Sequence, residues 1–425
     1  MWTSNRIHMI LLVTMILMGA PAAQGNDQML GNLIQEALVN NPDLLALQAG
    51  IEAAEHRIPQ AKALPDPMIM AGYQNEGYDS YTYGDMPDAQ WMFSASQMFP
   101  FYGKRALKGE MAFQETESLR SEYESARLDT IARVKELYYE LFLAHKNVEI
   151  IQDRIDLFSR IEDAALARYS SGMAPQQEVL MAQTEKYMLL EREEMYRQTI
   201  QATTGMLNSL VGRPVNTAVE KPQELTATLF PYSLDLLLEK LQHDSPMIRS
   251  RQQMIREAEA GVEMARKEYF PDVTLTGSSF QRKGDFDDMW SLTAQINLPL
   301  FYRQKQRQGV LEAQARLMQN ERKHSAAHAM LAARLKDSYS MFTAAESLMD
   351  LYKEGLIPKT YQDFQSALTG YGTGQVEAIT VISRLKSLLD YELLYWAQLV
   401  EREKAIARVE ALVSIADEGK KGSEG

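Results

Sequence analysis

Two stretches of this chain share one pattern, and that pattern decides the fold. Residues 91–103 read WMFSASQMFPFYG, and residues 290–302 read WSLTAQINLPLFY. Each stretch begins with Trp, alternates apolar and polar side chains over about eight residues, and reaches a Pro before a long charged segment. Alternation with a period of two is typical of a β-strand with two unlike faces, so both stretches are predicted to be strands.

The second stretch separates its two kinds of side chain most cleanly. The apolar face carries Trp290, Leu292, Ala294, Ile296 and Leu298, and the opposite face carries Ser291, Thr293, Gln295 and Asn297. A partner segment precedes each stretch: MIMAGY at residues 68–73 and VTLTGSSF at residues 273–280. The sequence therefore predicts two β-hairpins, at about residues 66–101 and about residues 271–300.

Two interpretations of these hairpins compete. In the first, they cover a soluble core and bury one face. In the second, they belong to a transmembrane β-barrel, in which side chains alternate between lipid and lumen and aromatic residues gather at the two interfaces. The second interpretation assigns Trp290, Leu292, Ile296 and Leu298 to lipid, and Ser291, Thr293, Gln295 and Asn297 to the lumen.

Four strands are too few to close such a barrel. An open strand edge in lipid leaves backbone groups unpaired at several kcal/mol each, and the smallest membrane barrels need about eight strands. If the strands span a membrane, several copies of the chain must pool them. Two copies would give eight strands around a filled interior, and three would give twelve strands around an open lumen.

Composition excludes several classes of protein. The chain has 425 residues, a formal charge of −13 and no cysteine. The acidic balance argues against nucleic acid as a partner, and the absence of thiols excludes disulfides and cysteine-ligated metals. His324 and His328 lie four positions apart, but no third ligand is evident. No nucleophile motif, phosphate loop or paired-carboxylate site is present, so we predict a protein without catalysis, cofactor or bound metal.

The first 23 residues are predicted to be a secretory signal peptide. Arg6 supplies the positive region, ILLVTMILM at residues 10–18 is an apolar core, and APAA at residues 20–23 offers cleavage after Ala22 or Ala23. The apolar run is too short for a bilayer of ~30 Å. We therefore expect an exported protein.

The chain is predicted to contain two copies of one unit. Trp290 lies 199 positions after Trp91, and Asp272 lies 206 positions after Asp66. Such landmarks recur in one order, which is the signature of an internal repeat. We predict a first repeat at 24–212, a linker at 213–233, a second repeat at 234–415 and a disordered tail at 416–425.

Very long helices follow the hairpins. No Pro occurs between Pro100 and Pro175, and residues 103–169 are predicted to form one helix of roughly 100 Å. Its apolar residues, including Val134, Tyr138 and Leu141, recur at steps of three and four, as along a coiled-coil seam. In the second repeat, Gly355 and Pro358 are expected to break or kink the corresponding helix.

Several motifs in a fixed order resemble the outer membrane efflux (TolC) family. They are LPDP at 64–67, SQMFPFYGK at 96–104, Tyr169-x-x-Gly172 with EVL at 178–180, LIP at 356–358, and Tyr371-x-x-Gly374. The resemblance covers about residues 30 to 415. The PFYGK segment and the LIP break are most similar to the heavy-metal (CzcC/CusC-like) branch of that family.

The resemblance implies a mainly α-helical chain with a small β part. Four strands per chain would complete a twelve-stranded barrel in a homotrimer, and long antiparallel helices would form a tunnel through the periplasm. The implied partners are outer-membrane lipid, a periplasmic membrane-fusion adaptor and an inner-membrane pump of the RND type. The implied location is the outer membrane with a periplasmic extension.

The resemblance also implies two groups of site residues. The adaptor would contact the tips of two helical hairpins, at Gly172, Gly374, Glu178, Val179 and Leu180. The periplasmic gate candidates are Tyr371, Glu377 and Glu178. On the residues alone, Gly172 and Gly374 also fit ordinary helix-terminating glycines.

The predicted function is an exit duct that passively conducts substrates, with heavy-metal ions as candidate cargo, from an inner-membrane pump to the exterior. Two alternatives stay open at this point. One is the exit duct of a type I secretion system. The other is a soluble periplasmic coiled-coil scaffold or adaptor. Hairpins that bury their apolar face on a soluble core would favour this alternative.

Overall fold

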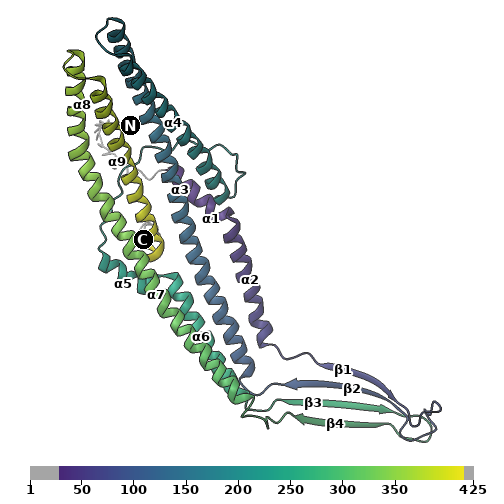
Figure 1. Ribbon diagram of the computed structural model, residues 1–425. Helices are drawn as coiled ribbons and strands as arrows, with labels where there is room; N and C mark the ends of the chain where they lie inside the picture. The colour runs from purple at the N-terminus through teal and green to yellow at the C-terminus, as the bar shows by residue number, and fades with distance from the viewer. Residues whose placement is uncertain (1–27, 416–425) are drawn as a thin grey trace, which may run out of the picture.

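The computed structural model describes residues 28–415, and within that range helices dominate (Figure 1). A small sheet projects from one end of the helical body (Figure 1). The predicted signal peptide at 1–23 and the predicted tail at 416–425 lie outside the described residues. Among residues 28–415, no helix combines the length and the apolar character that a membrane crossing requires.

The first half of the chain passes from helices into a hairpin and back into helices. Its elements are α1 (Gln28–Asn40), α2 (Pro42–Lys62), β1 (Met68–Gln74), β2 (Gln90–Phe99), α3 (Lys104–Ser170) and α4 (Gln176–Leu210). The second half follows a similar order after a segment without helix or strand. Its elements are α5 (Leu234–Asp244), α6 (Pro246–Lys267), β3 (Val273–Gln281), β4 (Met289–Ile296), α7 (Gln306–Asp350), η1 (Leu351–Leu356), α8 (Ile357–Gly372) and α9 (Ala378–Val413).

The helix α2 begins where the sequence places a capping residue and a proline. The Asn41 side chain accepts hydrogen bonds from the backbone N–H groups of Asp43 and Leu44, at 2.9 and 3.1 Å. Pro42 follows at the first helical position, where its missing N–H costs nothing. Ser245 and Pro246 occupy the same two positions at the start of α6, although the Ser245 side chain makes no capping hydrogen bond.

The helix α3 is the longest element and extends along most of the molecule (Figure 1). It has 67 residues, close to the predicted helix at 103–169. Gly103 begins it with a φ of 91°, a left-handed conformation that allows the chain to turn sharply from β2 into the helix. Val134, Tyr138 and Leu141 are buried as the spacing predicted.

The helix of the second half continues through Gly355 and Pro358, so the predicted break is wrong, and the regular α-helix changes to a π-helical turn there instead. A π-helical turn, η1, joins α7 to α8 without an interruption. Pro358 lies in the first turn of α8, just after the wider π turn. A π turn adds one residue to the helical repeat, which lets the chain absorb a proline that would clash in a regular α-helix.

The four strands form one antiparallel sheet in the order β1-β2-β3-β4. The central pair joins the two halves of the chain, with Phe99 opposite Val273 and Trp91 opposite Gln281. β1 and β4 are the outer strands, so each has one edge without a partner in the described chain.

The strand β4 is shorter than predicted. It ends at Ile296, so Asn297 and Leu298 lie beyond the strand, contrary to their assignment as strand residues. Pro299 has no N–H for a ladder bond and restricts the residue before it. The free edge of β4 also leaves this end without a second strand to hold it.

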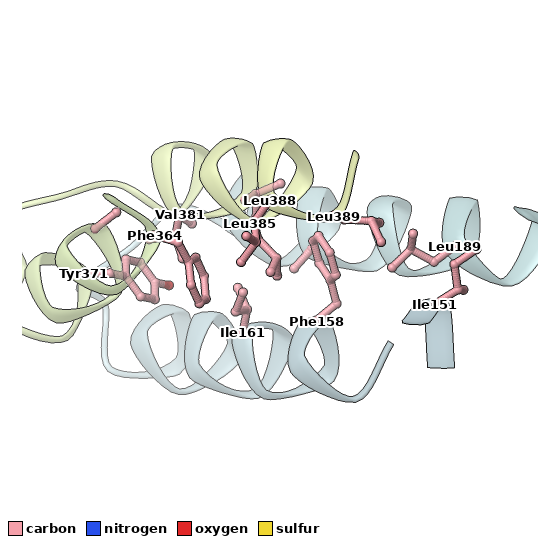
Figure 2. Close-up of a cluster of buried hydrophobic side chains, with 14 of the residues drawn as sticks. Ile151, Phe158, Ile161, Leu189, Phe364, Tyr371, Val381, Leu385, Leu388 and Leu389 are labelled. Atoms are coloured by element: carbon pink, nitrogen blue, oxygen red, sulfur yellow. The ribbon is translucent and has the colours of Figure 1, made fainter. Parts of the chain in front are cut away.

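The end of the molecule opposite the sheet is packed around a buried apolar cluster (Figure 2). Phe158 and Leu385 are 0% exposed, and they come from α3 and α9. α4 and α8 add Leu189 and Phe364 to the same cluster. Four helices from both halves of the chain therefore share one core there.

Candidate functional site

The helical hairpins end in two glycine turns of the same design. The turn between α3 and α4 contains Gly172 with a φ of 73°, and the turn between α8 and α9 contains Gly374 with a φ of 78°. In the first turn, the N–H of Met173 bonds to the carbonyl of Arg168 at 2.8 Å, and that of Gly172 bonds to the carbonyl of Tyr169 at 2.9 Å. This pair of bonds is a Schellman motif, which ends a helix and requires a left-handed residue.

Both turns lie at the surface. A Cβ atom built on Gly172 would meet nothing within 4 Å, and one built on Gly374 would meet only the Arg168 guanidinium, at 4.0 Å. Neither glycine is therefore required by crowding inside this chain. The positive φ explains why glycine is favoured, and the open space leaves each turn accessible to another protein.

Next to these turns, one contact cluster joins the two hairpins. The Tyr371 hydroxyl on α8 donates a hydrogen bond to the Glu178 carboxylate on α4, at 3.2 Å. Arg168 on α3 donates to the backbone carbonyl of Tyr371 at 2.7 Å, and its guanidinium lies 4.6 Å from the centre of the Tyr371 ring. We call Arg168, Glu178 and Tyr371 the tip cluster.

Burial and charge keep Tyr371 neutral. Only 3% of the residue is exposed. Burial first, and then the neighbouring Glu178 carboxylate, raise the pKa of Tyr371 to about 12. The phenol is therefore a hydrogen-bond donor throughout the physiological range, and the tip cluster does not titrate through this group near neutral pH.

The other predicted tip residues fall in different surroundings. Glu377 is the exposed N-cap residue of α9, and its side chain makes no capping hydrogen bond there. Leu180 is 52% exposed, whereas Val179 is 7% exposed. Val179 therefore cannot offer a surface to a partner, which corrects its assignment as a docking residue. Neighbouring residues on a helix point about 100° apart, so one of them can face the core while the other is exposed.

Sequence reasoning missed the cation of the tip cluster and further ties between the hairpins. Arg168 was not predicted, although it precedes the Tyr-x-x-Gly motif by one residue. Lys386 on α9 bonds to Glu185 on α4 at 2.8 Å, and Arg192 on α4 bonds to Asp390 on α9 at 3.3 Å. The four side chains are between 22% and 52% exposed, so each pair contributes at most about 1 kcal/mol.

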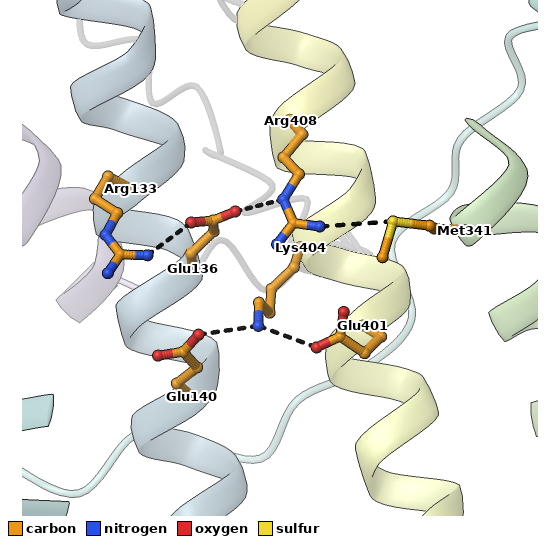
Figure 3. A network of polar contacts seen from close by, with 7 residues as sticks. All are labelled: Arg133, Glu136, Glu140, Met341, Glu401, Lys404 and Arg408. Atoms are coloured by element: carbon orange, nitrogen blue, oxygen red, sulfur yellow. Dashed lines mark hydrogen bonds and ion pairs between the residues drawn. The ribbon is translucent and has the colours of Figure 1, made fainter. Parts of the chain in front are cut away.

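Further along the helices, a polar network holds α3 against α9 (Figure 3). The Glu136 carboxylate accepts from Arg408 at 2.6 Å and from Arg133 at 3.0 Å. Lys404 bonds to Glu140 at 2.9 Å and to Glu401 at 3.0 Å. The network joins the two halves of the chain about midway along α3.

The charge of Lys404 is stabilised within this network. Burial lowers the pKa of Lys404, but its bonds to Glu140 and Glu401 outweigh burial and leave the pKa above its ordinary value. A raised lysine pKa stabilises the folded state fully below the unfolded value, and this contribution is lost only as pH rises through the folded value. The network is therefore intact at neutral pH.

The sheet has one apolar face that no part of the described chain covers. By register, Trp290, Ser279 and Phe93 form one row on this face, and Ile296, Val273 and Phe99 form another. Trp290 is 81% exposed and Leu292 is 71% exposed. Large exposed apolar patches of this kind mark surfaces that bind another protein, a ligand or a membrane.

The opposite face of the sheet carries hydroxyl groups in rows. Ser94, Ser278 and Ser291 lie side by side across three strands, and Ser96, Thr276 and Thr293 form the neighbouring row. Gln295 is on the same face, opposite Thr274. The alternation predicted from the sequence therefore holds for residues 290–296 and gives the sheet two chemically different faces.

No metal site emerges from the described residues. Within residues 28–415, no group of three or more His, Asp or Glu side chains could hold a metal ion.

A family profile described as outer membrane efflux protein matches residues 33–213 and 237–389. The solvent efflux pump outer membrane protein SrpC of Pseudomonas putida is 26% identical over 298 residues, which cover 65% of this chain and 62% of SrpC. The cobalt-zinc-cadmium resistance protein CzcC of Cupriavidus metallidurans is 22% identical over 379 residues, which cover 88% of this chain and 87% of CzcC. The match to SrpC thus spans less than two thirds of that protein.

Solved structures agree in fold. The outer membrane protein VceC of Vibrio cholerae superposes with a TM-score of 0.78 and 19% identity, over 91% of this chain and 96% of that chain.

Proposed function

The chain belongs to the outer membrane efflux protein family, and from this premise we propose that it is the exit duct of a tripartite efflux system. Its location is the outer membrane. The duct conducts its cargo passively, and an inner-membrane pump of the RND type supplies the energy. A periplasmic membrane-fusion adaptor connects pump and duct.

One observation carries this proposal: an exposed apolar face on a sheet whose two outer edges are both free. Trp290 and Leu292 on this face would be in contact with water in a lone soluble chain. Lipid removes that cost, since each Å² of apolar surface taken out of water stabilises by about 25 cal/mol. A free strand edge, however, is not tolerated in lipid.

The free edges lead to a ring of three copies. Each copy contributes four strands, so a homotrimer would close a twelve-stranded barrel. The similar element order of the two halves supports an internal duplication, with the segment at 213–233 as the linker. Because each repeat then supplies one hairpin and one set of long helices, six similar units would surround one axis.

Within that barrel, the two faces of the sheet take opposite surroundings. Trp290, Leu292 and Ile296 would face lipid. Ser291, Thr293 and Gln295 would face the lumen, where hydroxyl and amide groups keep their water. Asn297 and Leu298 would join these faces only if β4 becomes longer in the assembled ring.

The tip cluster is the proposed gate. Tyr371 and Glu178 join α8 to α4, so opening the hairpins apart at the periplasmic end requires breaking the 3.2 Å bond between them. Arg168 would lose its stacking on the Tyr371 ring in the same movement. Glu377 stays a gate candidate only as an exposed carboxylate near the second turn.

The two glycine turns are the proposed adaptor contacts. Gly172 and Gly374 are open to solvent, and Leu180 adds an exposed apolar side chain next to the first turn. Small residues at a helix tip let a second helical hairpin approach closely. Glu178 belongs to this surface at its edge, while its carboxylate also bonds to Tyr371.

Heavy-metal ions are the proposed cargo. The alignment with the cobalt-zinc-cadmium resistance protein covers 88% of this chain, against 65% for the alignment with the solvent pump protein SrpC. The relative SrpC would instead suggest organic solvents as the cargo. The assay therefore compares metal ions with an organic solvent.

Two measurements test the proposal. A strain lacking its own metal exit duct should regain growth on zinc or cadmium when it expresses this chain with the cognate adaptor and pump. Restored growth on toluene but not on metal would reject the cargo assignment. A purified mature chain that is monodisperse and single in buffer without detergent would reject the duct itself.

A further inference from the structure

The two halves of the chain are joined by a buried ion pair at the base of the sheet. The Lys104 ammonium, at the start of α3, lies 2.9 Å from the Asp272 carboxylate, which stands just before β3. It also donates to the carbonyl of Phe270 at 3.2 Å. Lys104 is only 3% exposed.

Two aromatic rings and a second carboxylate, that of Glu268 at 3.4 Å from the Lys104 ammonium, also belong to this junction. The N–H of Phe101 donates to Asp272 at 2.7 Å. The rings of Phe101 and Phe270 stack with their centres 4.4 Å apart and their planes 9° apart. We call Phe101, Lys104, Glu268, Phe270 and Asp272 the central junction. It connects the end of one hairpin to the beginning of the next.

Counterparts of the central pair occur at the two free edges of the sheet. Asp66 stands before β1 as Asp272 stands before β3, each directly after a Pro. Arg303 follows Pro299 by four positions, as Lys104 follows Pro100 by four positions. Asp66 and Asp272 are 206 positions apart, and Lys104 and Arg303 are 199 positions apart, which are the spacings that relate the two halves of the chain. In each half, an acidic residue precedes the hairpin and a basic residue follows it.

These counterparts are exposed, and within residues 28–415 neither forms an ion pair. Arg303 only lies near its neighbour, with its guanidinium 5.9 Å from the Tyr302 ring. They cannot meet within one chain as the central pair does, because the strand order puts Asp66 at the β1 edge and Arg303 at the β4 edge. Each is half of a junction that this chain does not complete.

We propose that Arg303 of one copy pairs with Asp66 of the next copy and so completes an equivalent junction at each subunit boundary. The inference rests on the proposed ring of copies, since only a ring brings a β4 edge beside a β1 edge. The inference adds which two residues form the contact between neighbouring copies. An Arg–carboxylate pair can be bidentate, and the guanidinium keeps its charge at any accessible pH, which suits a contact between subunits.

The central register predicts how the strands pair across the boundary. Phe99 is opposite Val273 within the chain. The repeat equivalent of Phe99, 199 positions later, is Leu298, and that of Val273, 206 positions earlier, is Pro67. The same pairing across the boundary would therefore place Leu298 opposite Pro67 of the next copy. β4 would then continue to Leu298 in the ring, which accounts for its early end at Ile296 in a single chain.

Cross-linking tests the pairing directly, because the chain has no cysteine of its own. The double variant Asp66→Cys/Arg303→Cys is purified as full-length protein in detergent and treated with a short bismaleimide. Denaturing gels should show covalent dimers and trimers. Each single variant should run only as a monomer, because its three thiols lie far apart around the ring.

A mixed sample distinguishes contacts between chains from contacts within a chain. Co-expressed Asp66→Cys and Arg303→Cys single variants should give covalent dimers but no covalent trimers, since no chain carries both thiols. Trimers of normal native mass in light scattering without any cross-link would overturn the pairing and leave the duct intact. A particle of single-chain mass would instead overturn the proposed duct.

A charge exchange checks the pair without cysteines. Asp66→Arg and Arg303→Asp should each lower the temperature at which the trimer dissociates in detergent. The variant with both changes should regain most of the loss, because opposite charges again face each other across the boundary. Strictly additive losses would show that the two residues do not pair.

Discussion

The two ends of this molecule treat their apolar side chains in opposite ways. At the hairpin tips, Phe158 and Leu385 are 0% exposed in a core shared by four helices. At the sheet, Trp290 is 81% exposed and Ile69 is 85% exposed. The tip end has a buried core within one chain, whereas the apolar side chains of the sheet stay exposed within one chain.

This difference separates the two tasks of a duct. In the proposed trimer, the sheet end would gain its stability from lipid and from other copies. The tip end gains its stability from a core that α3, α4, α8 and α9 of one chain share, so parting the two hairpins, as the proposed gating requires, would cost contacts within that core. The following experiments, ordered from the largest expected effect to the smallest, test this contrast.

The largest effect is expected from a charge on the apolar face of the sheet. Leu292→Arg should abolish assembly in the outer membrane, since an arginine facing lipid costs about 2–4 kcal/mol per chain near the bilayer midplane. Thr293→Arg, one residue away on the hydroxyl face, should assemble. Membrane fractionation and trimer yield measure both. Equal losses in the two variants would reject the assignment of the faces.

A loss of stability confined to the tip end is expected from a cavity in the tip core. Leu385→Ala should destabilise the tip end by about 2–5 kcal/mol, because the side chain is fully buried. Leu180→Ala is the matched control, since Leu180 is 52% exposed. Thermal unfolding followed by circular dichroism in detergent should show a lower midpoint for the first variant alone. A similar shift in both would contradict a self-contained tip core.

A local effect is expected at the tip cluster. Tyr371→Phe removes the donor to Glu178 and should cost about 1.5 kcal/mol, the lower end for a bond to a charged group. If the cluster holds the hairpins together, single-channel conductance in planar bilayers should rise. Unchanged conductance would show that the hydrogen bond between Tyr371 and Glu178 plays no part in gating.

The pH dependence of the same contact has a defined sign. Burial and Glu178 raise the pKa of Tyr371 to about 12, above the ordinary tyrosine value of 10.0. Its contribution is therefore fully present below pH 10 and is lost as pH rises through the folded pKa. At pH 7, the conductance of Tyr371→Phe should differ from that of the unsubstituted protein. The two conductances should become equal only as the pH approaches the folded pKa of about 12, where the unsubstituted protein also loses this hydrogen bond.

The smallest effect on assembly is expected at the glycine turns. Gly172→Trp and Gly374→Trp project into open space, so only the strain of a left-handed residue, about 1–2 kcal/mol, opposes them. Trimers should form normally, while metal resistance in a dependent strain should fall. Gly172→Asn, which tolerates positive φ and stays small, should keep both. Full resistance in the Trp variants would argue against adaptor contact at the tips.

Much of the fold follows from local patterns in the sequence. The strand faces around Trp290 and the long helix from residue 104 were predicted because side-chain periodicity is a local property. The end of β4 and the continuous helix at Pro358 were not predicted. The first depends on a missing neighbouring strand, and the second on a π turn that no residue type specifies.

The tip cluster was only half visible in the sequence. Tyr371 and Glu178 were candidates by resemblance, but their bond joins positions 193 residues apart. Val179 was wrongly placed at the surface because a motif does not state which side of a helix faces the core. Arg168 carried no signal apart from its place beside the Tyr-x-x-Gly turn.

By itself, the sequence determined the alternation of the strands, the length of the helices, the turns at Gly172 and Gly374, and the repetition of these features. The tertiary structure alone decided that Tyr371 meets Glu178 and that Lys104 meets Asp272. The reason is physical. Periodicity and turn chemistry act over a few neighbouring residues, whereas these pairs form only after helices and strands distant in the chain have packed side by side.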